Sequence, residues 1–142
     1  MTPPFDHHAP VGLNPLHAIL LASMVPLFLG ALLCDIAYAR SYEIQWTNFA
    51  SWLIAGGLVL CGLAGVWALV DLLRVDRRRA RPWLFVALLI GTFVFGFVDS
   101  LIHAKDAWAS MPGGLIASVI VAILAVLSTW LGFSHIRART AA

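Results

Sequence analysis

Four long apolar segments, at residues 16–38, 49–72, 83–102 and 115–133, occupy most of this 142-residue chain and are joined by short polar connections. A helix needs roughly 20 apolar residues to cross the hydrocarbon core of a bilayer, which is about 30 Å thick. Each segment comes close to that length. The pattern therefore predicts an all-α membrane protein folded as a bundle of four transmembrane helices.

Composition excludes most other classes of protein. Hydrophobic residues make up 61% of the chain and charged residues only 11%, and a soluble domain of this size could not hide so much apolar surface from water. The formal charge of +2 does not indicate nucleic-acid binding, because the basic residues lie at the ends of segments rather than in one stripe. The expected surroundings are a lipid bilayer.

The chain has no visible repeat or linker, so one bundle is expected: an irregular N-terminal tail at 1–15, a transmembrane domain at 16–136 and a C-terminal tail at 137–142. Seven of the nine Lys and Arg residues fall on the side shared by the two termini and the second connection, and the other two are Arg40 and Lys105. By the positive-inside rule, both termini are expected in the cytoplasm.

The first span carries two polar residues on one face. His17 and Asp35 are 18 residues apart, which is about five turns of 3.6 residues, so both point the same way. Met24, Phe28 and Ala31 lie near the same line, which is expected to face the bundle interior. At 1.5 Å per residue the pair is separated by roughly 27 Å, so His17 belongs to the inner interface and Asp35 to the outer one.

The third span ends in a second polar pair. Asp99 and His103 share a face at i, i+4, with Thr92 and Phe95 leading up to them. A lone charged Asp near the bilayer centre costs about 3 kcal/mol, so both residues are expected to face protein in the outer third of the membrane. Several polar residues fall on that side. The predicted outer polar cluster comprises Asp35, Glu43, Asp99, His103 and Asp106, together with the cations Arg40 and Lys105.

Two histidines are candidate cofactor ligands, His17 and His103. A haem iron takes imidazole nitrogens from facing helices at one depth, and these two lie near opposite surfaces. A bis-histidine haem would need His17 with His135, or two copies of His103 across a dimer. The chain has no CxxCH motif, so a haem b would be non-covalent.

Other chemistry has weaker support in the sequence. Asp-x-x-x-His also presents two metal-capable groups, although a structural hydrogen bond is its more common meaning, and we predict no metal site. No serine has an evident histidine and acid partner at its own depth, so no catalytic residue is predicted and a hydrolytic enzyme is not expected. A chain without catalytic activity of its own is favoured, and an enzyme that works only through a bound redox cofactor stays open.

Small residues form two stripes that would let helices approach closely. These stripes predict packing within the bundle and leave a homodimer open. Their members are Gly57, Cys61 and Gly65 in the second span and Ser118, Ala122, Ala125, Thr129 and Gly132 in the fourth.

Residues 14–67 read NPLHAILLASMVPLFLGALLCDIAYARSYEIQWTNFASWLIAGGLVLCGLAGVW, and residues 103–108 read HAKDAW. These stretches resemble a family of bacterial four-span membrane proteins catalogued as domain of unknown function 2231, and the resemblance covers the bundle from Asn14 onward. The family usually has a proline where this chain has Met24. The residues that the resemblance singles out are His17, Asp35, Glu43, Trp46, Asn48, Asp99, His103, Asp106 and Trp108.

The resemblance implies a multi-pass protein of the bacterial inner membrane. Some similar proteins are fused to Rieske-type domains or encoded beside quinoprotein dehydrogenases and c-type cytochromes, which implies a redox setting. The first hypothesis is thus a redox-associated membrane subunit that binds haem b or a quinone, or docks a periplasmic electron-transfer partner. The alternative is a non-catalytic anchor or assembly factor whose polar cluster is structural. Ion transport is disfavoured by the long apolar middle of each span.

Overall fold

The computed structural model describes residues 14–74, 82–105 and 107–140. They form four long helices and one short one, with no strand among them. The helices are α1 (Pro15–Ser41), α2 (Ile44–Arg74), α3 (Pro82–His103), α4 (Ala107–Ser110) and α5 (Gly113–Thr140).

Four of these helices are long and apolar enough to cross a membrane: Pro15–Ser41, Ile44–Leu73, Trp83–His103 and Gly113–Ser134. The predicted bundle of four transmembrane helices is confirmed, and the chain is a multi-pass membrane protein. Residues 1–13 of the expected N-terminal tail lie outside the described residues. The structure continues α5 to Thr140, so helix covers most of the segment expected to be a C-terminal tail.

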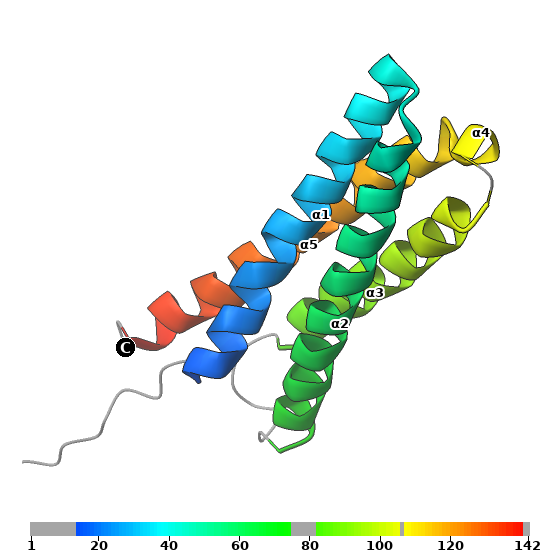
Figure 1. Ribbon diagram of the computed structural model, residues 1–142. Helices are drawn as coiled ribbons and strands as arrows, with labels where there is room; N and C mark the ends of the chain where they lie inside the picture. Colours follow the sequence, from blue (N-terminus) through cyan, green and yellow to red (C-terminus); the bar gives the residue numbers. More distant parts are fainter. Residues whose placement is uncertain (1–13, 75–81, 106, 141–142) are drawn as a thin grey trace, which may run out of the picture.

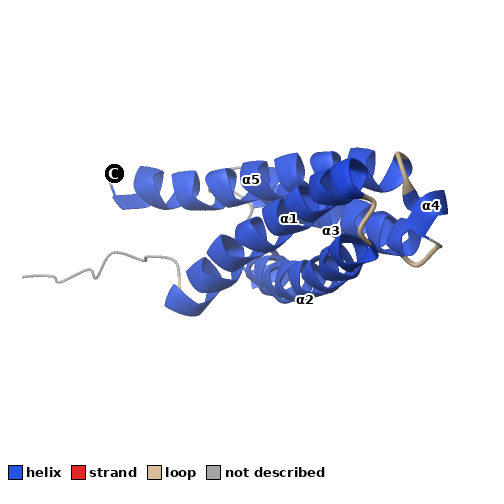
Figure 2. Ribbon diagram, turned by 45° about the horizontal axis from the view of Figure 1, so that its top comes forward, coloured by secondary structure: helices blue, strands red, loops and turns tan. Residues whose placement is uncertain are grey.

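The long helices form a closed ring of neighbours (Figures 1 and 2). Helices α1 and α3 each pack against both α2 and α5, so α1 and α3 lie diagonally across the bundle. The start of α1, the end of α2 and the end of α5 lie together at one end, which we call the terminal end. The α1–α2 connection and the short α4 lie at the other, which we call the α4 end.

The interior face of α1 follows the predicted line. Buried residues recur every three or four positions, as expected when one stripe of a helix faces its neighbours. They are His17, Leu21, Met24, Phe28, Ala31, Asp35 and Tyr38. The aromatic ring at the centre of this line needs small residues opposite it: a Cβ on Gly57 of α2 would lie only 2.8 Å from the Phe28 ring.

Helix α5 closes the ring through its small-residue stripe. Ser118, Ala122 and Ala125 are buried against the other helices. The Thr129 hydroxyl donates a hydrogen bond to the Leu21 carbonyl oxygen at 3.0 Å, which ties α5 to α1 across the helix interface. The stripe thus serves packing within one chain, as small residues do between membrane helices.

The interior face of α3 differs in one residue from the prediction. Thr92, Asp99 and His103 are buried, but Phe95 is 45% exposed. The buried positions are Thr92, Gly96, Asp99 and His103, which are spaced by four, three and four residues. Residue 95 is not in this series and falls on the outward side of the helix. The prediction for Phe95 was wrong because of the direction of its offset: at about 100° per residue, Phe95 lies roughly 40° from Asp99 on one side, whereas the buried Thr92, Gly96 and His103 lie on the other side.

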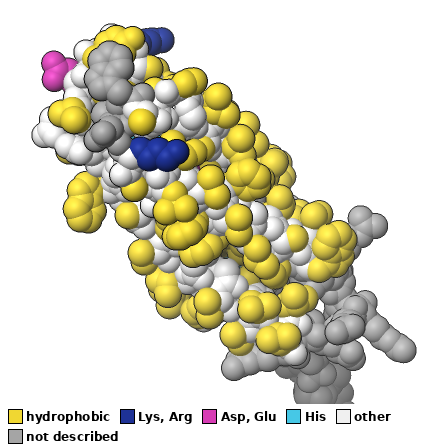
Figure 3. Space-filling model, turned by 90° about the vertical axis from the view of Figure 1, so that its right-hand side faces the viewer, with side chains coloured by type: hydrophobic (Ala, Val, Ile, Leu, Met, Phe, Trp, Pro, Cys, Tyr) yellow, Lys and Arg dark blue, Asp and Glu magenta, His cyan; other side chains and the backbone are white. Residues whose placement is uncertain are grey.

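The outside of the bundle is apolar over its middle. In Figure 3 hydrophobic side chains cover the face between the two ends, whereas Lys or Arg and acidic side chains gather near the α4 end. Large apolar residues such as Leu33, Val59 and Phe97 are more than half exposed. Apolar surface of this extent requires lipid around it.

Candidate functional site

Four polar side chains from three helices meet inside the α4 end of the bundle. They are Asp35 of α1, Asp99 and His103 of α3, and Ser118 of α5, and we call them the Asp–His cluster. Their exposed fractions are 0%, 0%, 6% and 1%. Helices α1 and α3 both run toward this end and α5 starts from it, which brings the last turns of the first two beside the first turns of the third.

The imidazole of His103 is engaged on both sides. Its Nε2 lies 2.8 Å from Asp35 Oδ1, across the diagonal of the bundle. Its Nδ1 lies 3.0 Å from the backbone carbonyl oxygen of Asp99 and 3.1 Å from Asp99 Oδ1. The carbonyl oxygen is the hydrogen-bond acceptor, because Asp99 Oδ1 is buried and has no hydrogen bond.

Ser118 bridges the two carboxyl groups. Its Oγ lies 2.5 Å from Asp35 Oδ2 and 3.0 Å from Asp99 Oδ2. The backbone of α5 also approaches the ring closely, since a Cβ on Gly114 would lie 3.0 Å from His103 Cε1. Glycine at this position therefore lets the imidazole lie directly against α5.

His17 lies at the terminal end, as predicted, and is buried there. Its ring stacks on Trp67 of α2, with the centroids 5.7 Å apart and the planes 22° apart, and Phe85 of α3 lies 6.1 Å away at a tilt. Its Nε2 is buried without a hydrogen-bond partner among the described residues. The structure thus places His17 and His103 at opposite ends, as their positions in the sequence predicted.

Part of the predicted outer cluster is not brought into contact with the rest. Glu43 is exposed in the α1–α2 connection, and Asp106 lies outside the described residues. Arg40 and Lys105 are exposed as well. The buried site is therefore smaller than the predicted one.

Ser118 is the member of the site that sequence reasoning missed. We expected no serine to have acid and histidine partners at its depth, and for Ser118 this was wrong, because it contacts two carboxyl groups. The arrangement is nevertheless not a nucleophile and base pair. His103 Nε2 faces Asp35 rather than the Ser118 hydroxyl, so the imidazole is not placed to take the serine proton as it does in a Ser–His pair.

Neither a metal ion nor a haem suits the cluster in this geometry. Among residues 14–74, 82–105 and 107–140 no group of three or more His, Cys, Asp or Glu side chains is arranged to hold a metal. A haem iron would need an imidazole nitrogen of His103 as ligand. Both nitrogens already face oxygen atoms of the protein, so ligation would break the contacts with Asp35 or Asp99.

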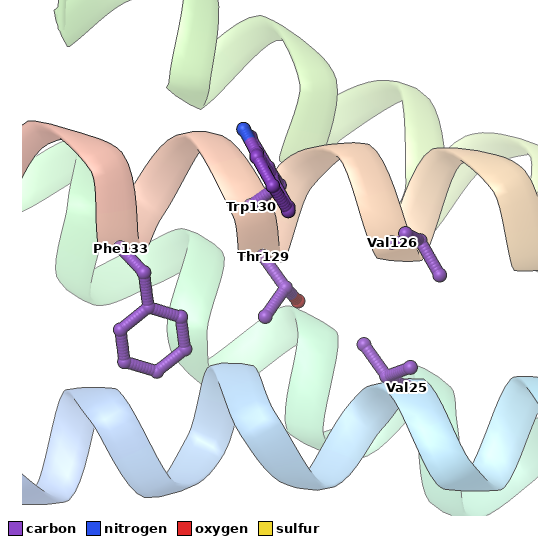
Figure 4. A pocket seen from close by; sticks show the side chains of 5 residues that line it. All are labelled: Val25, Val126, Thr129, Trp130 and Phe133. Atoms are coloured by element: carbon purple, nitrogen blue, oxygen red, sulfur yellow. The ribbon is translucent and has the colours of Figure 1, made fainter.

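A groove of about 340 Å³ lies between α1 and α5 (Figure 4). Val25, Val126, Thr129, Trp130 and Phe133 line it, and the indole nitrogen of Trp130 points away from α1. The Thr129 hydroxyl is already bonded to the Leu21 carbonyl oxygen. The groove therefore has little polar chemistry with which to orient a ligand.

These features define a four-span membrane protein with a buried carboxyl and imidazole cluster at one end of its bundle. The chain belongs to the family of predicted membrane proteins DUF2231, whose family model matches residues 13–136. The predicted family membership is confirmed. No curated protein and no solved structure matches the chain.

Proposed function

We propose that this protein is a non-catalytic membrane anchor or assembly factor in which the Asp–His cluster locks the α4 end of the bundle. The observation that carries the proposal is that both ring nitrogens of His103 face oxygen atoms of the protein itself, inside a cluster at most 6% exposed. Buried polar groups that satisfy one another stabilise and orient helices, and they leave little free hydrogen-bonding capacity for a substrate.

The position of the cluster supports a locking role. Helices α1 and α3 are not neighbours in the ring, yet the contact between Asp35 and His103 joins them across the diagonal. The hydrogen bond from Ser118 to Asp35 connects α5 to the same cluster. In lipid the hydrophobic effect does not drive helices to associate with one another, so polar contacts between helices help to select the correct packing. This cluster specifies which faces of three helices meet.

Substitution of His103 tests the proposal. We expect His103→Gln to lower the unfolding temperature of the detergent-purified protein, because the buried Asp35 carboxyl group and the Asp99 carbonyl oxygen lose the imidazole that contacts them. Glu43→Gln, which changes an exposed acid at the same end, is the matched control and is expected to leave that temperature unchanged. A visible spectrum recorded after expression with ample haem should show no Soret band. A stoichiometric Soret band that disappears in His103→Gln would overturn the proposal.

A redox-associated subunit that binds haem b or a quinone is the second candidate, and it is supported by His17 rather than by His103. The buried Nε2 of His17 lacks a partner among the described residues, and the ring stacks on Trp67. An imidazole N–H beside an indole face suits the carbonyl and flat ring of a quinone. His17→Phe keeps an aromatic ring while removing the nitrogen, so only the redox candidate expects it to abolish quinone or haem binding.

The orientation in the membrane is part of the proposal. In the sequence, seven of the nine Lys and Arg residues fall on the side shared by the two termini and the second connection, which supports an inner-membrane protein with both termini in the cytoplasm. The α4 end would then face the periplasm, where an electron-transfer partner could dock. Alkaline phosphatase fused to the C-terminus should be inactive, and an active fusion would reverse the orientation. The periplasmic partner and the homodimer remain predictions.

A further inference from the structure

The number of hydrogen bonds in the Asp–His cluster determines how many hydrogens the cluster must hold. Four hydrogen-bonding contacts hold it together: His103 Nδ1 to the Asp99 carbonyl, His103 Nε2 to Asp35, and Ser118 Oγ to each carboxyl group. Each contact needs one hydrogen between its two heavy atoms. A neutral imidazole supplies one and the serine hydroxyl supplies one. The other two contacts therefore need two more protons.

We infer that the Asp–His cluster is a proton-binding site, which holds two protons beyond those of a neutral imidazole and two carboxylates, one of them on Asp99. The inference rests on the same buried cluster as the proposed function but assigns it a ligand, the proton. Two carboxylates carry two negative charges, so the two added protons make the cluster electrically neutral. Neutrality removes most of the cost of burying charge at a site shielded from water.

The partners of each carboxyl group place the protons. Asp35 faces the imidazole at Oδ1 and the serine hydroxyl at Oδ2, so it is the better acceptor and the natural counterion of a doubly protonated His103. Asp99 Oδ1 is buried without a hydrogen bond, since His103 Nδ1, which lies 3.1 Å from it, is hydrogen-bonded to the Asp99 carbonyl oxygen instead. An unbonded oxygen costs less on a neutral carboxyl group than on a carboxylate. Asp99 therefore donates its proton to Ser118 Oγ, and Ser118 donates to Asp35.

Among residues 14–74, 82–105 and 107–140, no other charged side chain of the neighbouring helices lies beside the cluster to supply a balancing charge in place of these protons. The only charged residues of α2 are Asp71 and Arg74, and the charged residues of α5 begin beyond Ser134, all toward the terminal end. On α1 and just beyond α3 the nearest cations are Arg40 and Lys105, both exposed. Glu43 is exposed as well. The cluster must therefore reach neutrality with its own protons.

Infrared spectroscopy of the full-length protein in lipid, labelled with ¹³C at the aspartate side-chain carboxyl, tests the inference. A protonated carboxyl group has a C=O stretching band well separated from the bands of a carboxylate. At neutral pH the wild type should show such a band with the intensity of one carboxyl group, and Asp99→Asn should remove it. Asp71→Asn, which changes an exposed aspartate of α2, is the control and should leave the band in place. A wild type without the band, or a band that survives in Asp99→Asn, overturns the inference.

Ser118→Ala provides a second test that keeps both carboxyl groups. The protonated group on Asp99 loses its acceptor, so its C=O band should remain and shift in frequency. Ser128→Ala removes another buried hydroxyl of α5, which donates to the Leu124 carbonyl, and should not shift the band. An unshifted band in Ser118→Ala contradicts the proton-binding inference, whereas an unchanged unfolding temperature in His103→Gln contradicts the proposed role of the cluster in holding the helices together. The two ideas therefore fail separately.

Discussion

The contact between Asp35 and His103 can be measured as a coupling energy in a double-mutant cycle. The cycle combines Asp35→Asn, His103→Gln and the double variant. Breaking one partner of a buried ion pair costs about 3–5 kcal/mol. Neutral hydrogen bonds between membrane helices average roughly 0.6 kcal/mol and reach about 1.7 kcal/mol.

The geometry places this contact above the ordinary membrane hydrogen bond. The two atoms lie 2.8 Å apart, and both side chains are at most 1% exposed. Asn and Gln keep some hydrogen-bonding capacity, so we expect a coupling energy of about 2 kcal/mol, or roughly a 30-fold change in the unfolding equilibrium constant.

Reversible unfolding in mixed detergent micelles, followed by far-UV circular dichroism, is the assay. The control cycle pairs Asp35→Asn with Glu43→Gln, whose side chain is exposed, and should give a coupling energy near zero. A coupling energy for Asp35 and His103 at or below the roughly 0.6 kcal/mol of a neutral hydrogen bond would refute the buried charge pair.

Three glycine substitutions give further predictions in the same unfolding assay. Gly114→Ala places a Cβ 3.0 Å from His103 Cε1, in a ring held on both sides, so it should destabilise the protein by about 1–3 kcal/mol. Gly65→Ala meets no atom within 4 Å and should be neutral or stabilising by up to about 1 kcal/mol, the helix propensity of alanine over glycine. Gly57→Ala should also cost about 1–3 kcal/mol, because its Cβ would lie 2.8 Å from the Phe28 ring. Equal stability of Gly114→Ala and Gly65→Ala would contradict the tight packing around the imidazole.

The sequence predicted the helices and the inward face of the polar residues for a simple physical reason. A charged or imidazole side chain in a span is costly against lipid, so the face that carries it must turn toward protein. The five-turn spacing of His17 and Asp35 therefore identified the interior line of α1, which the burial of Met24 and Phe28 confirms. Asp99 and His103 identified the interior face of α3 in the same way.

Ser118 could not be found by that reasoning. A lone hydroxyl costs little in a membrane helix because it can bond its own backbone, so nothing in the sequence forces it inward. Its place in a stripe of small residues is also explained by packing alone. Only the arrangement of three helices shows that its Oγ lies between the carboxyl groups of Asp35 and Asp99.

Glu43 shows the opposite case, a residue that the sequence predicts in the cluster and that the structure places outside it. It was assigned to the outer cluster because it lies on the correct side of the membrane, but depth alone does not fix direction. Helix α1 ends at Ser41, and Tyr42 adopts a left-handed backbone conformation with φ 58°. Glu43 lies beyond this helix end, in the connection to α2, where its side chain is exposed.

The central claim, that Asp35 and His103 meet across the bundle, is tested most directly by solid-state NMR in lipid bilayers. Protein labelled with ¹⁵N in the histidine rings and ¹³C in the aspartate carboxyl groups should show magnetisation transfer between His103 Nε2 and Asp35 Cγ. The chain has five histidines and six aspartates, so the assignment rests on loss of that cross-peak both in His103→Gln and in Asp35→Asn. Its absence from the wild-type spectrum would contradict the account.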